Sequence, residues 1–85
     1  MEYVIISFRS RSHTIRFNDF LHRNGIGGEV INTPKEAGVG CGLSVKIPYG
    51  AFPIVKQAVF RSGLSSFAGF FLVKIVGGKR TVRSI

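Results

Sequence analysis

Four strand-like segments and two helix-like segments follow one another along this chain, and their order restricts the fold more than any other feature. The β-branched and aromatic run at 3–8 predicts a first strand that is buried on both faces. A helix should begin after a Ser10 or Ser12 cap and stop at Asn24-Gly25, and a second helix should run from about 51–53 to Ser62-Gly63. The remaining strands are expected at 29–32, 43–47 and 67–76.

This order is the split βαβ arrangement of ferredoxin-like folds. The expected fold class is therefore α+β, a ferredoxin-like βαββαβ domain whose four-stranded antiparallel sheet carries both helices on one face. In this topology the second and fourth strands lie at the edges of the sheet. A chain of 85 residues should form a single domain. We assign that domain to 1–76 and expect a short basic C-terminal tail at 77–85.

The predicted fourth strand is apolar on both faces, which is unfavourable for a strand with one face in water. Its two sets of apolar side chains are Phe71, Val73 and Ile75 on one side and Ala68, Phe70 and Leu72 on the other. We therefore predict a homo-oligomer that forms through the fourth strand or through the open face of the sheet. The alternative is that the basic tail folds back over this strand.

Twelve basic and four acidic residues give the chain a net charge of +8. This excess favours binding to a polyanion such as RNA, or to an acidic protein partner. Aromatic side chains on an open sheet can stack RNA bases, and Tyr3, Phe8 and Phe70 are the candidate platforms. The chain lacks the usual mixed aromatic and basic RNA motif, so these side chains fit a core or a dimer interface better.

The segment Thr33-Pro34-Lys35-Glu36 has the pattern of a helix N-terminus. Threonine would cap the helix, proline would take its first position, and glutamate would reach back to the cap amide. Gly38 follows so soon that we expect only about one turn of helix.

The only cysteine, Cys41, lies between Gly40 and Gly42 where a loop is about to become a strand. A lone thiol cannot form a disulfide within the chain and suits the reducing cytoplasm, where we expect the protein. We see no secretory signal at the start and no apolar run long enough to cross a membrane. The flanking glycines leave the thiol accessible, and a thiolate could take the terminal sulfur or selenium from a donor persulfide. The alternative is a small, semi-buried and unreactive side chain.

The segment from Thr33 to Glu36, followed by Cys41-Gly42-Leu43, resembles the family of small selenium/sulfur carrier-like domains. A first strand ending in Ser7-Phe8 and a helix closing with Leu21-His22-Arg23-Asn24-Gly25-Ile26 add to the resemblance, which covers about Tyr3 to Ile75. The family segment typically reads Thr-Pro-Arg, an acidic residue, several small residues and Cys-Gly. Here Lys35 replaces the arginine. Lysine keeps the positive charge but cannot form the two parallel hydrogen bonds that a guanidinium group donates to an anion. Glycine and valine at 38–40 stand where the family often has serines.

The resemblance implies a carrier or adaptor that holds sulfur or selenium and passes it between protein partners, and not an enzyme. Cys41 would be the reactive residue. The binding residues of the same site would be Thr33, Lys35, Gly40 and Gly42. We predict no cofactor and no metal, because His13 and His22 point to different faces of the first helix. Two other functions stay open: an RNA- or polyanion-binding module, and a small regulatory or structural dimerisation domain.

Overall fold

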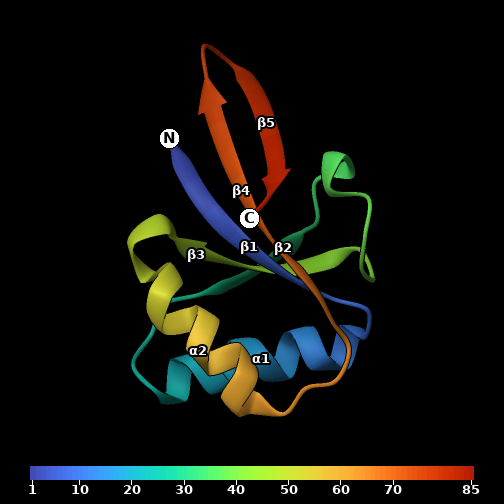
Figure 1. The fold of residues 1–85 in the computed structure, drawn as a ribbon, viewed down its shortest axis with the longest axis vertical. Helices are drawn as coiled ribbons and strands as arrows, with labels where there is room; N and C mark the ends of the chain where they lie inside the picture. The colour runs from blue at the N-terminus through green and yellow to red at the C-terminus, as the bar shows by residue number, and fades with distance from the viewer.

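The computed structural model of residues 1–85 contains a five-stranded sheet and two α-helices (Figure 1). The strands are β1 (Glu2–Phe8), β2 (Glu29–Asn32), β3 (Leu43–Pro48), β4 (Phe67–Val76) and β5 (Lys79–Ser84). The helices are α1 (Arg11–Arg23) and α2 (Phe52–Ser62), and two short 3-10 turns are η1 (Lys35–Ala37) and η2 (Tyr49–Ala51). Neither helix has the length and apolar character that crossing a bilayer requires.

Every strand pair in the sheet is antiparallel, and the spatial order is β2-β3-β1-β4-β5. The first four strands keep the predicted ferredoxin-like order, but the prediction of four strands is wrong because β5 extends the sheet. Gly77 and Gly78, with φ of 57° and 77°, form the two-residue turn between β4 and β5. The fourth strand is therefore not at an edge, because the chain folds back and pairs with it.

The predicted signals fix the ends of both helices. The Ser10 hydroxyl accepts a hydrogen bond from the His13 amide at 3.2 Å and caps α1. At the other end Gly25 has a φ of 74°, and the Ile26 amide donates to the Leu21 carbonyl at 2.9 Å. The helix α2 begins with proline in its first turn and ends before Gly63, whose φ is 69°.

The main core lies between the helices and one face of the sheet. Its twelve buried residues are Val4, Ile6, Phe8, Phe17, Leu21, Val45, Ile47, Val55, Ala58, Val59, Phe70 and Leu72. The ring of Phe8 is central, because its centroid lies 5.3 Å from that of Phe17 and 6.1 Å from that of Phe67. Burial of the first strand on both faces is confirmed, since residues 4–8 are all buried.

The opposite face of the sheet holds a smaller cluster of Ile5, Phe71 and Val73. Ala37 of η1 and Val82 of β5 pack against this cluster. Phe71 is consequently only 8% exposed, so the apolar face that we expected to meet water is largely covered by the chain itself. The tip of the β4–β5 hairpin extends away from the two helices, which lie together at the other end of the molecule (Figure 1).

Candidate functional site

All five predicted site residues lie in the segment 33–42, which we call the cysteine loop. The Thr33 amide donates to the Gly42 carbonyl at 2.9 Å and closes the base of this loop. The Cys41 amide donates to the Phe8 carbonyl at 3.0 Å. The backbone of Cys41 is therefore fixed against the last residue of β1, close to the start of α1.

The glycines on either side of Cys41 give the loop its path. Gly40 and Gly42 have φ of 90° and 91°, a region that other residues rarely adopt. A Cβ atom at Gly40 would lie 3.0 Å from the Phe8 carbonyl oxygen, which accepts the bond from Cys41. Gly40 is thus needed both for its conformation and for the close approach of the loop to β1.

The thiol of Cys41 is half-buried beside the first turn of α1. Its Sγ lies 3.6 Å from the Thr14 hydroxyl and 3.7 Å from the Leu43 carbonyl oxygen. The Thr14 hydroxyl also donates to the Ser10 carbonyl at 3.1 Å. Thr14 was not predicted as a site residue, since it lies 27 residues before the cysteine. Its only sequence signal is a position just after a helix cap.

The thiol of Cys41 lies beside the N-terminal end of α1, whose first turn supplies no carboxylate. The first turn of α1 has no acidic residue, and Arg9 and Arg11 stand on either side of the Ser10 cap. A helix N-terminus carries partial positive charge. The backbone atom in contact with Sγ is the Leu43 carbonyl oxygen, which accepts from the thiol.

The four predicted binding residues share a different surface of the loop. A shallow depression of about 320 Å³ is lined by Thr33, Pro34, Lys35, Gly38, Val39, Gly40 and Gly42. Cys41 does not line it, because its side chain lies against Thr14 and Leu43. The fold therefore brings Lys35 to the depression and Thr14 to the thiol.

The predicted capping box is wrong, because both of its polar side chains have other partners. Pro34 occupies the cap position of η1, and no side chain caps this turn. The Thr33 hydroxyl is instead 2.6 Å from that of Ser44, which is 2.9 Å from the hydroxyl of Ser7. Ser7 and Ser44 are fully buried, so these hydroxyls satisfy one another and anchor the loop to β1 and β3.

The Glu36 carboxylate binds Arg80 of β5. Arg80 Nη2 lies 2.9 Å from Oε1, and Arg80 Nε lies 3.0 Å from Oε2. The hydrogen bonds from Arg80 hold the pKa of Glu36 below its ordinary value of 4.5, and the carboxylate raises the pKa of Arg80. This ion pair ties η1 to the last strand.

The other candidates from the sequence have structural roles. Phe8 and Phe70 are 0% and 7% exposed beneath the helices, so neither presents a face for stacking a base. Tyr3 is half-buried, with Lys46 Nζ 4.5 Å from the centroid of its ring. The rings of His13 and His22 lie 2.6 Å from the Ser66 hydroxyl and the Gly28 carbonyl, respectively.

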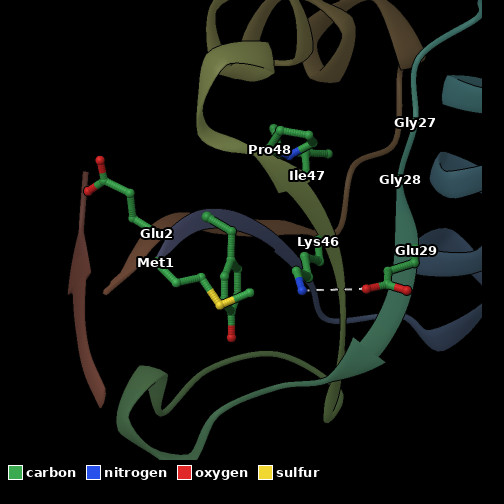
Figure 2. Close-up of a pocket in the computed structure, with 9 residues that line it drawn as sticks. Met1, Glu2, Gly27, Gly28, Glu29, Lys46, Ile47 and Pro48 are labelled. Carbon is green, nitrogen blue, oxygen red and sulfur yellow. Dashed lines mark ion pairs between the residues drawn. The ribbon is translucent and has the colours of Figure 1, made fainter. Parts of the chain in front are cut away.

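A second hollow, of about 390 Å³, lies away from the cysteine loop. Its lining residues are Met1, Glu2, Tyr3, Gly27, Gly28, Glu29, Lys46, Ile47 and Pro48. Figure 2 shows Lys46 pointing toward Glu29, and the ion pair between them measures 3.6 Å. Because the lysine is already paired, and because no predicted site residue lines the hollow, it is a weaker candidate than the cysteine loop.

Comparison with protein-family models shows that residues 3–66 match the family described as "Putative Se/S carrier protein-like". The match includes β1, α1, the whole cysteine loop and α2, and it ends before β4 and β5. Searches of curated proteins and of solved structures gave no match. The family match confirms the resemblance seen in the sequence, although it stops short of Ile75. Because it covers most of the chain, the protein belongs to the family of Se/S carrier-like proteins.

Proposed function

We propose that this protein holds sulfur or selenium on Cys41 and passes it from a donor protein to an acceptor protein. Membership of the Se/S carrier-like family supports the proposal. The observation that carries it is the contact of 3.6 Å between Cys41 Sγ and the Thr14 hydroxyl, in a loop fastened to β1 at Cys41 itself. A lone thiol also suits the reducing cytoplasm, where we place the protein.

The loading step is a thiolate exchange. The Cys41 thiolate attacks the terminal sulfur of a donor persulfide. A new S–S bond forms on Cys41 as the donor's S–S bond breaks, and the donor leaves as a thiolate that takes up a proton. The transferred sulfur brings its oxidation state with it, so the step needs no oxidant. Unloading to an acceptor thiolate repeats the exchange, and selenium would travel as the corresponding selenopersulfide.

Thr14 would stabilise the charged sulfur. Its hydroxyl can turn from the Ser10 carbonyl and donate to the thiolate or to the persulfide anion. A hydrogen bond to a charged group contributes about 1.5–3 kcal/mol. In this proposal Gly40 and Gly42 set the backbone, Thr33 anchors the loop through Ser44, and Lys35 offers its charge to an anionic group of a partner.

Loading of the purified protein from a small-molecule persulfide, followed by intact mass, tests the carrier function. The protein should gain one sulfur atom, and the Cys41→Ser variant should gain none. A Cys41 thiol that reacts with an alkylating reagent but never accepts sulfur would contradict the proposal.

The role of Thr14 has a test of its own. Thr14→Val keeps the shape and removes the hydroxyl, so loading should slow by about tenfold, which corresponds to about 1.4 kcal/mol. Thr14→Ser restores a hydroxyl and should recover most of the rate. A folded Thr14→Val variant that loads as fast as the native protein would show that the hydroxyl has no part in transfer.

No structural observation favours the two other functions. The candidate stacking platforms Phe8 and Phe70 are core residues, and β5 already occupies the edge of the fourth strand. RNA binding and self-association through the open sheet face stay predictions, which filter binding and sedimentation would measure.

A further inference from the structure

The charged residues of the β4–β5 hairpin are all basic, and two of them, Lys74 and Arg80, are paired with Glu2 and Glu36 outside it. Residues 67–85 contain four basic residues, Lys74, Lys79, Arg80 and Arg83, and no acidic residue. Residues 1–66 contain eight basic residues and all four acidic ones, which leaves +4 there and +4 on the hairpin. Half of the net charge of +8 therefore lies in the part of the chain that the family match does not cover.

The strand β5 is also the last strand of the sheet, and η1 contacts it through the Glu36–Arg80 ion pair. The Ile85 amide donates to the Phe70 carbonyl at 3.1 Å, and bonded positions recur at every second residue of an antiparallel pair. Lys79, Thr81 and Arg83 therefore bond to β4, in the register that the pairing shows. The residues between them direct their amides and carbonyls outward.

These outward positions are Arg80, Val82 and Ser84. No hydrogen bond from a loop or another element reaches their backbone groups. An edge with three free amides and three free carbonyls can accept one more strand, whose main chain would supply the missing hydrogen bonds.

We propose that β5 binds an extended acidic segment of a partner protein as an added strand. Acidic side chains of that segment would lie across from Lys79 and Arg83, while Arg80 stays bound to Glu36, and opposite charges across a strand pair stabilise the pairing. Lys79 and Arg83 lie on the same face of β5, so the acidic side chains of the added strand should lie on that face as well. The proposal uses no property of Cys41 and is independent of sulfur transfer.

A second copy of this chain and a nucleic acid fit the edge less well. A second copy would bring two hairpins of formal charge +4 edge to edge, and like charges near one another are destabilising. The hairpin also has no exposed aromatic ring for a base, because Phe67 is half-buried and Phe70 and Phe71 are buried. An acidic peptide uses both the free edge and the charge.

The test uses the full chain and a blocked peptide as long as β5, with alternating Glu and Thr. Amide hydrogen exchange is measured by NMR. At a peptide concentration of about ten times Kd, the amides of Arg80, Val82 and Ser84 should exchange about tenfold more slowly. The amides of Thr81 and Arg83, which already bond to β4, should be protected before the peptide is added. Cys41→Ser should bind the peptide as tightly as the native protein.

Two controls separate strand pairing from attraction by charge alone. A peptide of the same charge with proline in place of alternate threonines cannot pair and should bind at least about tenfold more weakly. The exposed substitution Arg83→Gln should weaken binding of the pairing peptide. Two outcomes would overturn the proposal: binding of the proline peptide as tight as that of the pairing peptide, or binding of polyuridylate that is tighter. In either case the three amides would stay unprotected, and β5 would be part of a general polyanion-binding surface.

Discussion

Arg80 holds both carboxylate oxygens of Glu36, at 2.9 and 3.0 Å, and so joins the last strand to the turn that precedes Cys41. The two residues are 44 positions apart in the chain. One belongs to the segment that matches the carrier family and the other lies beyond it. An exposed ion pair contributes little to global stability, but the two parallel bonds fix geometry. We infer that the pair orients the cysteine loop.

The first prediction concerns the substitution Arg80→Gln. Losing the two bonds should let residues 35–42 exchange their amide hydrogens faster, while the melting temperature hardly changes. Arg80→Lys is the matched control, since it keeps the charge but not the paired geometry and should resemble Arg80→Gln. Unchanged exchange in the loop of Arg80→Gln would mean that Ala37 packing and the Cys41 amide bond are sufficient to hold it.

The second prediction concerns acid. The hydrogen bonds from Arg80 hold the pKa of Glu36 in the folded protein below its ordinary value of 4.5, so the ion pair adds to stability at neutral pH. Its contribution is lost as the pH falls through the lowered pKa, where the carboxylate takes up a proton. Loop exchange, corrected for its intrinsic pH dependence, should therefore rise below pH 4.5 in the native protein. Glu36→Gln should lack this transition and be loose at every pH.

A third prediction follows from the path of the loop. Gly40→Ala should destabilise the protein by about 1–2 kcal/mol in urea unfolding, because alanine is strained at this positive φ and its Cβ would crowd the Phe8 carbonyl. Gly27→Ala is the control, since a Cβ there meets nothing and the φ is ordinary. Its effect should stay within about 0.5 kcal/mol. A similar loss of stability in both variants would show that the left-handed conformation of Gly40 does not contribute to the free energy of unfolding.

The fourth prediction compares two phenylalanines. Phe17 is fully buried against Phe8, and Phe17→Ala should cost about 3–5 kcal/mol, enough to unfold much of so small a domain. Phe60 is 72% exposed on α2, and Phe60→Ala should change stability by no more than about 0.5 kcal/mol. Circular dichroism during thermal unfolding distinguishes the two. A large loss in Phe60→Ala would indicate that this ring is covered in solution.

Elements with local signals were predictable. The helix cap, the stop at Gly25 and the glycine pair after β4 each act through their immediate neighbours. The structure has the last two where the sequence placed them, and of the two predicted caps, Ser10 and Ser12, it uses Ser10. The strand β5 has no such signal, because Lys79–Ser84 contains a single apolar residue, Val82. Only its pairing with β4 and the cover it gives to Phe71 make it a strand.

The candidate site also combines features that have a local sequence signal with contacts that have none. The glycines on either side of Cys41 are visible in the sequence, and their positive φ could be anticipated because glycine adopts it readily. The contacts of Thr14 with the thiol and of Arg80 with Glu36 join residues that only the folded sheet brings together. The capping box failed for this reason as well, because a buried partner on β3 competes successfully for the Thr33 hydroxyl.

The central place of β1 has a consequence for synthesis on the ribosome. This strand is translated before the other four strands, yet one of its two neighbours in the sheet is β4, which begins at Phe67. Until then Val4, Ile5 and Ile6, which are fully buried in the finished domain, belong to a strand with one side unpaired. The nascent chain therefore cannot complete its core in stages, and a ribosome stalled near residue 66 would hold an aggregation-prone intermediate.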